Sequence, residues 1–230
     1  MSRDRPGGHH RDMRNDSYGT ATGRGPRAGW LVPTGLILLV LVPVLAGAVR
    51  LAELAGLGGP AADASSVPLV VHIVAVTVYG LVGAFQFSPR FRRRRPGWHR
   101  GAGRVLVGCG LAGALSGLWL TLFSALPPQD AGLVAVFRLV FGSAMFGSLV
   151  LGLAAVRRRD LRRHRAWMIR AYAIGLGAGT QAVTLGAWFA VHGPPDAFTR
   201  ALLLGAAWMI NLAVAEWVIR RGQRGTRLVS

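Results

Sequence analysis

The sequence predicts an all-α integral membrane protein, a bundle of six membrane-spanning helices with both termini in the cytoplasm. Hydrophobic residues make up 52% of the 230 positions, and they come in continuous runs rather than at the period of an amphipathic helix or strand. Each run is about 20 residues long or more, which is enough to cross a bilayer. The 27 basic residues, all of them arginine, gather in the links between the runs and in the tails. Long apolar runs separated by basic links are typical of a multi-pass membrane protein.

Three segments follow from this pattern: a disordered basic tail over residues 1–29, a transmembrane domain over 30–219, and a second basic tail over 220–230. Both tails are expected in the cytoplasm. The first tail has six arginines, three aspartates and no apolar periodicity. The first apolar run starts only after this tail and is longer than the apolar region of a signal peptide, so we expect an uncleaved helix. The six expected spans are Trp30–Val49, Pro68–Phe87, Val105–Ala125, Gly132–Val156, Ala166–Val191 and Thr199–Ile219.

The links between the spans alternate in charge, and this alternation predicts which side each link faces. The segment Arg90–Arg104 holds seven arginines and no acid, and the link Arg157–Arg165 holds six arginines against one aspartate. The links 50–67, 126–131 and 192–198 carry few charges. Because arginine is enriched on the cytoplasmic side, we place the two basic links and both tails inside, where 23 of the 27 arginines then lie.

The net charge of +18 would indicate a nucleic-acid partner in a soluble protein. Here the arginines lie beside membrane spans, so the expected partners are the lipid bilayer and its anionic phospholipids, with no nucleic acid. Association into a homo-oligomer is left open. The only cysteine, Cys109, lies within an apolar run, and a single cysteine excludes an intrachain disulfide.

The second span carries His72, Tyr79, Gly83 and Gln86 at steps of seven, four and three residues. These steps place all four on one face of a helix. An ionisable group that faces lipid is costly, so this face should turn toward the interior of the bundle. His72 then either contributes to a binding pocket or forms a hydrogen bond to a neighbouring helix.

Arg138 lies within the fourth span, about one and a half turns from the outer surface. No span supplies an acid at this level, since Glu216 is near the opposite end of the sixth span, where Arg220 at i+4 is its expected partner. An unpaired Arg138 indicates an anionic ligand or a lipid headgroup; the alternative is a side chain that extends to the outer surface. The sequence thus predicts an outward-opening pocket for a small anionic ligand or lipid, lined by His72, Tyr79, Arg138, Gln181 and Asn211.

His99 and His164 each begin a span directly after a basic link. Two histidines at equal depth on different helices suit a b-type haem, with Arg100, Arg104 or Arg170 near its propionates. The same residues suit contact with phospholipid headgroups. Two alternatives to the ligand pocket therefore stay open: a redox protein that holds haem b or a quinone, and an assembly or scaffold subunit whose polar groups serve helix packing.

Catalytic motifs give no support for an enzyme. The letters GCGLAG at Gly108–Gly113 match a dinucleotide fingerprint, but they lie in a continuous apolar helix without a preceding strand. Gly113 and Gly117, like Gly175 and Gly179, have the spacing of small residues that let membrane helices pack closely. No residues match a hydrolytic triad, a metalloprotease motif or a phosphate loop, so no catalytic or metal-binding residue is predicted.

Three stretches resemble a known family: HIVAVTVYGLVGAFQF in the second span, HRGAGR after the basic link, and HRAWMIRAYA at the start of the fifth span. They are similar to an uncharacterised prokaryotic family of predicted membrane proteins with a domain of unknown function. The resemblance covers roughly His72–Gln181, and the ending AWMINLAVAEWVIRR resembles its actinobacterial members. It implies a protein of the bacterial plasma membrane and no established activity. The residues to which it gives weight are His72, Gln86, His99, Arg100, Arg104, His164, Met168 and Arg170.

Overall fold

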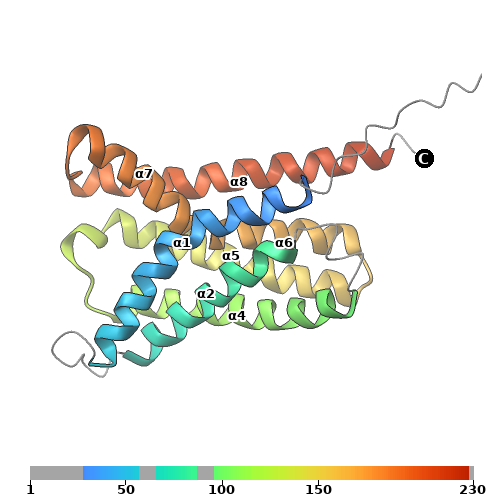
Figure 1. The fold of residues 1–230 in the computed structure, drawn as a ribbon, viewed down its shortest axis with the longest axis horizontal. Coiled ribbons are helices and arrows are strands. Elements are labelled where there is room, and N and C mark those ends of the chain that lie inside the picture. Colours follow the sequence, from blue (N-terminus) through green and yellow to red (C-terminus); the bar gives the residue numbers. More distant parts are fainter. Residues whose placement is uncertain (1–27, 57–65, 87–95, 228–230) are drawn as a thin grey trace, which may run out of the picture.

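The computed structural model describes residues 28–56, 66–86 and 96–227, and within these ranges the chain is helical, with short turns and no strand. Five of the described helices are long and apolar enough to cross a membrane, and two shorter ones make a sixth crossing if that bent pair counts as one span. The predicted all-α membrane bundle is confirmed. The tail residues 1–27 and the segment 87–95, which includes part of the basic link, lie outside the described residues. The elements are α1 (Ala28–Leu54), α2 (Ser66–Gln86), α4 (Pro96–Phe123), η1 (Pro128–Asp130), α5 (Leu133–Arg157), α6 (Leu161–Gly175), α7 (Gly177–His192) and α8 (Ala197–Arg227) (Figure 1).

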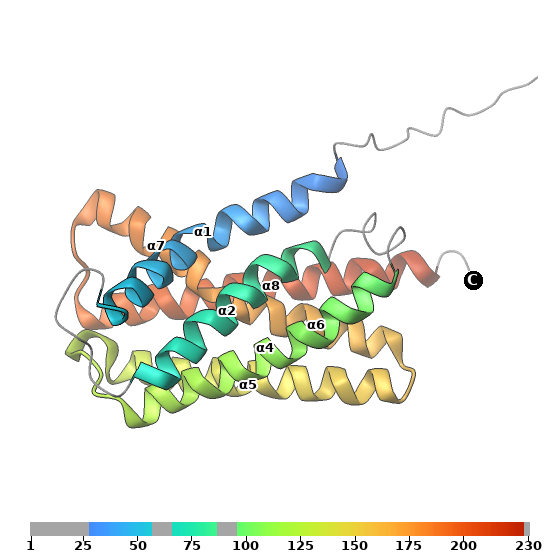
Figure 2. The ribbon, with the colours of Figure 1, turned by 60° about the horizontal axis from the view of Figure 1, so that its bottom comes forward.

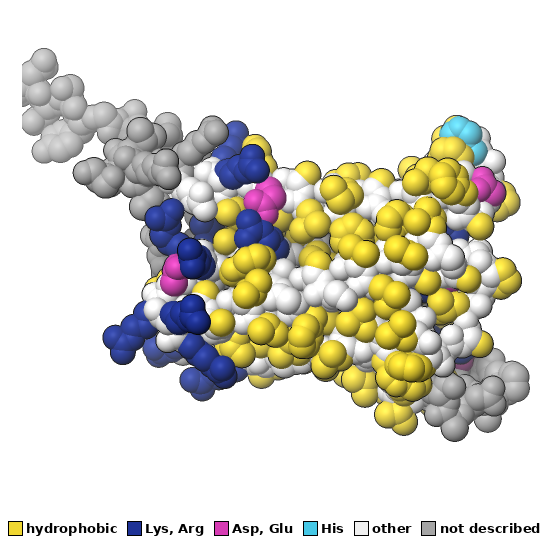
Figure 3. Space-filling view, turned by 180° about the vertical axis from the view of Figure 1, so that it is seen from behind, with side chains coloured by type: hydrophobic (Ala, Val, Ile, Leu, Met, Phe, Trp, Pro, Cys, Tyr) yellow, Lys and Arg dark blue, Asp and Glu magenta, His cyan; other side chains and the backbone are white. Residues whose placement is uncertain are grey.

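The helices form an elongated bundle whose two ends differ in charge (Figures 1 and 3). Arginine side chains gather at one end, which holds the start of α6 and the last turns of α8, where Arg165 lies against Gly222. The other end holds η1 and the start of α8, which Asp130 joins through Arg200. We call these the arginine end and the aspartate end.

Six of the helices pack in a closed ring. α1 packs on α2, α2 on α4, α4 on α5, α5 on α8, α8 on α7, and α7 returns to α1. The remaining helix, α6, packs against α5, α8 and α2 (Figure 2). α6 begins at the arginine end and stops inside the bundle, where α7 begins and continues to the aspartate end.

Two tyrosines form the centre of the core, at the level where α6 ends. The rings of Tyr79 on α2 and Tyr172 on α6 lie 5.6 Å apart between centroids. The hydroxyl of Tyr172 donates a hydrogen bond of 2.7 Å to the carbonyl of Gly80. Gly83 leaves room for the Tyr172 ring, because a side chain there would overlap it. These contacts fix α6 against α2 by aromatic packing and one buried hydrogen bond.

Small residues set the distance between α2 and α4, as the glycine spacing predicts. A β-carbon added to Gly113 would lie 3.0 Å from a methyl group of Val76, and one added to Gly117 would lie 3.0 Å from the imidazole of His72. The two helices therefore approach closely because neither glycine carries a side chain. This confirms the packing role predicted for Gly113 and Gly117.

The fifth span is broken, so the continuous helix predicted over Ala166–Val191 is wrong. α6 ends at Gly175, α7 begins at Gly177, and their axes differ by 41°. The glycines around the break favour helix poorly. With 15 and 16 residues, the two helices are about 22 and 24 Å long, so neither alone crosses a hydrocarbon core of about 30 Å. If the two helices form one crossing, the break lies within the membrane.

Two other boundaries differ from the predicted ones. α4 begins at Pro96, ahead of the expected Val105, because proline is well suited to the first turn of a helix. His99, Arg100 and Arg104 therefore lie on α4 itself rather than in the preceding link. α8 continues to Arg227, so most of the predicted tail over 220–230 extends the last helix.

Candidate functional site

His72 is tied to the neighbouring helix. Its Nδ1 lies 2.9 Å from the carbonyl oxygen of Gly113 and 3.2 Å from Oγ of Ser116, both on α4. A carbonyl oxygen only accepts, so Nδ1 carries the proton and donates it to Gly113. Ser116 in turn donates to the carbonyl of Ala112 at 2.6 Å. Of the two roles open to His72, the hydrogen bond to a neighbouring helix is the one confirmed.

Arg138 has an acidic partner, so the prediction that it is unpaired is wrong. Its Nη2 lies 2.9 Å from Oδ2 of Asp130. The other carboxylate oxygen, Oδ1, accepts from Nε and Nη2 of Arg200 on α8, at 3.1 and 2.9 Å. The acid comes from η1, the turn before α5, rather than from a span. We call Arg138, Asp130 and Arg200 the Asp130 clasp.

The clasp is partly shielded from solvent, with 18% of the Asp130 side chain exposed, against 32% for Arg138 and 28% for Arg200. Partial burial by itself raises the pKa of the Asp130 carboxyl. The hydrogen bonds and positive charges of Arg138 and Arg200 outweigh that effect and hold this pKa below its usual value. The carboxylate therefore stays ionised at neutral pH and joins the starts of α5 and α8.

Gln181 and Asn211, the polar members predicted for the pocket from α7 and α8, also bond between helices. Nδ2 of Asn211 donates to the carbonyl of Ala173 at 3.1 Å, and its Oδ1 accepts from the hydroxyl of Thr180 at 2.8 Å. Nε2 of Gln181 donates to the carbonyl of Leu204 at 3.4 Å. Tyr79, the remaining member, is buried in the core.

The structure therefore places all five predicted pocket residues at helix–helix contacts. None of them lines either of the two cavities at the arginine end. His72 and Arg138 were expected to face one cavity because they lie at matching depth on the second and fourth spans, and an anionic ligand was expected there because Arg138 was expected to lack an acid. Without that premise the outward-opening pocket stays a prediction, with Arg138 already neutralised by Asp130.

A second ion pair lies toward the arginine end. Arg170 on α6 donates from Nε and Nη2 to the two carboxylate oxygens of Glu216 on α8, at 2.5 and 3.1 Å. Arg170 is therefore the partner of Glu216 at ion-pair distance, while the charge of Arg220, the predicted partner at i+4, also acts on this carboxylate. The guanidinium of Arg170 also lies 4.7 Å from the centre of the Trp167 ring. Because Glu216 already neutralises Arg170, the headgroup or propionate contact predicted for Arg170 loses its basis.

The two histidines proposed for haem lie on different helices. Nδ1 of His164 on α6 donates to the carbonyl of Gly152 on α5 at 2.8 Å. His99 is half-buried in the first turns of α4, followed by the exposed Arg100 and Arg104. Within residues 28–56, 66–86 and 96–227, no three histidine, cysteine or acidic side chains are grouped to hold a metal ion. The haem site stays a prediction.

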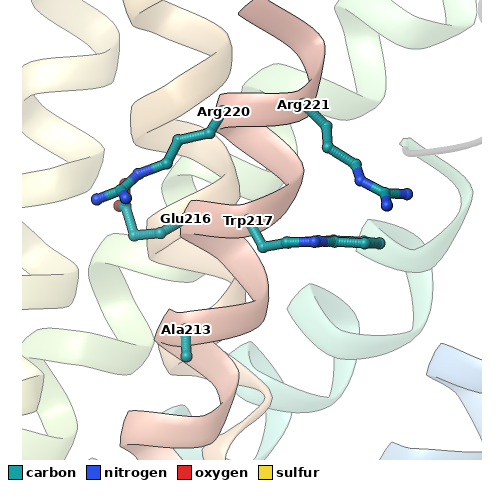
Figure 4. A pocket seen from close by; sticks show the side chains of 5 residues that line it. All are labelled: Ala213, Glu216, Trp217, Arg220 and Arg221. Atoms are coloured by element: carbon teal, nitrogen blue, oxygen red, sulfur yellow. The ribbon is translucent and has the colours of Figure 1, made fainter. Parts of the chain in front are cut away.

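One hollow is a groove beside the last turns of α8, with a cavity volume of about 510 Å³. Figure 4 shows Glu216 and Arg220 extending to one side of the helix and Trp217 and Arg221 to the other. The guanidinium of Arg221 lies over the Trp217 ring, 4.0 Å from its centre. We call this the α8 groove, and its lining residues are Ala213, Glu216, Trp217, Arg220 and Arg221.

A smaller cavity of about 180 Å³ lies between α6 and α8 at the same end. Arg162 and Arg165 line it from α6, and Gly222 and Gln223 from α8. The sequence prediction missed both hollows, although the α8 groove has a readable signal. A tryptophan lies one turn before two consecutive arginines at the end of an apolar span, which is the composition of a membrane interface.

Comparison with known proteins identifies a family. Residues 69–219 match the family described as "Predicted membrane protein (DUF2306)". The match begins near the start of α2, leaves α1 outside, and ends within the α8 groove. It is longer than the resemblance expected from the sequence. Neither a curated protein nor a solved structure matches the chain.

Proposed function

We propose that this chain, which belongs to the DUF2306 family of predicted membrane proteins, binds the anionic headgroup of a membrane amphiphile in the α8 groove. The protein itself is a multi-pass membrane protein. The observation that carries the proposal is the lining of the groove, which combines an interfacial tryptophan with two arginines. Among the described residues, neither Arg220 nor Arg221 forms an ion pair with an acid.

The groove has a suitable arrangement for a phosphate group. Stacking on Trp217 holds Arg221 in one orientation, and stacked arginines keep their N–H groups free at the edge of the guanidinium plane. Those N–H groups match phosphate oxygens in geometry and charge. The Trp217 side chain is 54% exposed, as expected of an indole at the headgroup level. Ala213, one turn deeper, leaves space for the first part of an acyl chain.

Glu216 does not cancel the positive charge of the groove. Its two carboxylate oxygens accept from Arg170, so this pair is close to neutral as a unit. Arg220 and Arg221 are then left as an excess of two positive charges. Each arginine near an anionic membrane surface contributes about 1 kcal/mol to lipid binding. Two such contributions correspond to about a 30-fold preference for an anionic headgroup over a neutral one.

The proposal also states which side of the membrane the α8 groove faces. We infer that the arginine end faces the cytoplasm of a bacterium, since arginine is enriched on that side of plasma-membrane proteins. The groove would then face the inner leaflet, whose anionic lipids carry the matching charge. The distribution of arginines in Figure 3 supports this orientation.

A packing role is the second candidate function. The polar side chains predicted to line a pocket are hydrogen-bonded between helices, as in His72 with Gly113 and Asn211 with Ala173. This favours an assembly or scaffold subunit, the alternative in which such groups serve the bundle itself. A headgroup in the α8 groove is compatible with that role, because the groove uses none of these side chains.

The test compares two double variants that remove equal charge from the arginine end. Arg220→Gln with Arg221→Gln removes the groove arginines, and Arg100→Gln with Arg104→Gln removes two exposed arginines of α4. Each protein is reconstituted with phosphatidylcholine and phosphatidylglycerol, extracted in neutral detergent, and its retained lipids are counted by native mass spectrometry. We expect the groove variant to lose about tenfold or more of its bound phosphatidylglycerol and the α4 variant to lose less than about twofold.

Equal losses in the two variants would show that diffuse charge, and not the groove, attracts the lipid. A further arm adds excess inorganic phosphate during extraction. Displacement of phosphatidylglycerol by phosphate alone identifies a free anion as sufficient, whereas retention identifies the amphiphile as the ligand. Unchanged retention in the groove variant would contradict the proposed function.

A further inference from the structure

The break in the fifth span separates two helices that are held very differently. In α6 the residues that lead to the break are buried, from Ala171 through Ile174. In α7 only Gly177 and Gly179, both in its first turn, are buried. α6 is thus part of the core, whereas α7 beyond its first turn lies on the outside of the bundle (Figure 2).

One residue of α8 bonds to both sides of the break. Asn211 donates to the carbonyl of Ala173 in the last turn of α6 and accepts from the hydroxyl of Thr180 in the first turn of α7. The indole of Trp208, one turn earlier on α8, fills the space that a side chain at Gly177 would need. Both bonds of Asn211, at 3.1 and 2.8 Å, have ordinary hydrogen-bond lengths.

Beyond Asn211, the polar contacts between α7 and α8 are long. Nε2 of Gln181 lies 3.4 Å from the carbonyl oxygen of Leu204, and the hydroxyl of Thr184 lies 3.4 Å from that of Leu203. Hydrogen bonds of this length are weak. On its other side, α7 touches α1 at Gly179, which lies against the carbonyl of Leu39. The buried residues of α7 are therefore confined to its first turn, and beyond it Leu185 packs against the cluster of Val134, Ala201 and Leu204.

We propose that α7 is a hinged arm that pivots at Leu176 and that Asn211 is the latch that sets its angle. This goes beyond the proposed headgroup binding and does not depend on it. Local opening is expected where a segment has few buried contacts and weak hydrogen bonds, and α7 has both properties. An arm of 16 residues is about 24 Å long, so a rotation of roughly 15° would move its far end by about 6 Å.

The test measures the distance between spin labels in lipid nanodiscs, in a Cys109→Ala background that removes the only cysteine. One pair joins Val191, near the end of α7, to Leu122 on α4; both side chains are exposed. The reference pair joins Leu161 on α6 to Leu115 on α4, also exposed. In Asn211→Leu we expect the first pair to gain a second population displaced by about 6 Å, while the reference pair keeps its distribution.

Two threonine variants complete the experiment. Thr180→Val removes only the α7 side of the latch and should produce the same second population at a lower fraction, which keeps the test decisive if Asn211→Leu fails to insert. Thr121→Val makes the same chemical change on α4, where the hydroxyl bonds within its own helix, and should change neither pair. An α7 distribution that stays single in both latch variants, or a change in both pairs alike, would overturn the hinge.

Discussion

At the aspartate end one carboxylate forms ion pairs with two arginines, whereas toward the arginine end one carboxylate forms an ion pair with a single arginine. Asp130 accepts from Arg138 and Arg200, and Glu216 accepts from Arg170. Beyond Glu216, Arg220 and Arg221 on α8 form no ion pair with any described acid. The two ends thus contain the same kinds of charged group, but every arginine named at the aspartate end has a carboxylate partner, whereas Arg220 and Arg221 at the arginine end do not.

The difference shows what decides whether a charge in this bundle needs an internal partner. Arg138 and Arg170 lie along the spans, where an unpaired charge costs several kcal/mol, and each has an acid from another element. Arg220 and Arg221 lie where α8 leaves the apolar region, and there phosphate groups and water can surround them. An arginine that pairs with an acid of the bundle therefore indicates a structural role for that arginine. An arginine beside a groove without such an acid indicates a binding site for an anionic ligand.

The largest expected difference between the two ends of the bundle is the side of the membrane from which each can be labelled. In a Cys109→Ala background, a cysteine at Gln129 in η1 should react almost completely with an impermeant thiol reagent in intact cells. A cysteine at Arg159 in the α5–α6 link should react only after the cells are opened, because arginine-rich links stay in the cytoplasm. Labelling of Arg159→Cys from outside would reverse the orientation and place the α8 groove in the other leaflet.

Breaking the Asp130 clasp should have the largest effect on stability. Asp130→Asn leaves two partly shielded arginines without their acid, which should cost about 2 to 3 kcal/mol. In nanodiscs this corresponds to a fall of about 5 to 10 °C in the apparent melting temperature. The control, Asp196→Asn, changes an exposed carboxylate that caps α8 through Thr199 and should lower the melting temperature much less. Equal losses would show that the clasp adds nothing beyond a helix cap.

The clasp also predicts a stability loss in acid. The folded-state pKa of Asp130 lies below its unfolded value of about 3.9, because the effects of Arg138 and Arg200 exceed that of burial. Its contribution is therefore complete above about pH 4 and disappears as the pH falls further, through the folded-state pKa. Melting temperatures from about pH 6 to pH 2.5 should show this loss in the parent protein. Asp130→Asn should lack that part of the decline, and an identical decline in both proteins would exclude the clasp as its source.

Glu216→Gln should give a smaller effect that depends on the lipid. Arg170 then lacks its acid, but it lies beside the α8 groove, where an anionic headgroup can replace the carboxylate. We expect a loss of about 1 to 2 kcal/mol in phosphatidylcholine nanodiscs, and about half of that loss in phosphatidylglycerol. The stability loss caused by Asp130→Asn should be the same in phosphatidylcholine and in phosphatidylglycerol nanodiscs. A loss that is equal in both lipids would contradict the proposed access of headgroups to this region.

The length of the apolar runs predicted the helices well because a span is a local property. α2 covers Ser66–Gln86 where Pro68–Phe87 was expected, and the bond from His72 to α4 follows from the cost of a polar group in lipid. The break at Leu176 was missed because Ala166–Val191 is continuously apolar. Its signal was present in the alternating glycines of the letters GLGAG, which favour helix poorly and admit neighbouring side chains.

Two of the ion pairs could not be predicted, because their partners are distant in sequence. Arg170 and Glu216 are 46 positions apart, and Asp130 and Arg200 are 70 apart. Asp130 was read as an acid of an outer turn, and only the fold shows η1 bringing it beside Arg138. The tryptophan and two arginines near the end of α8 mark a membrane interface in the sequence, but they do not show that a hollow lies beside them. Local rules therefore gave the elements, and tertiary packing decided which charges are neutralised.

The central claim is that an anionic headgroup occupies the α8 groove, and photocrosslinking tests it most directly. The protein is reconstituted in phosphatidylcholine with a small amount of a phosphatidylglycerol analogue that carries a diazirine at its headgroup, and the adducts are mapped by mass spectrometry. We predict adducts concentrated on residues 213–221, lost on competition with unlabelled phosphatidylglycerol and retained with phosphatidylcholine. Adducts spread evenly over the arginine-bearing helix ends, or the same adducts from a zwitterionic diazirine lipid, would contradict the claim.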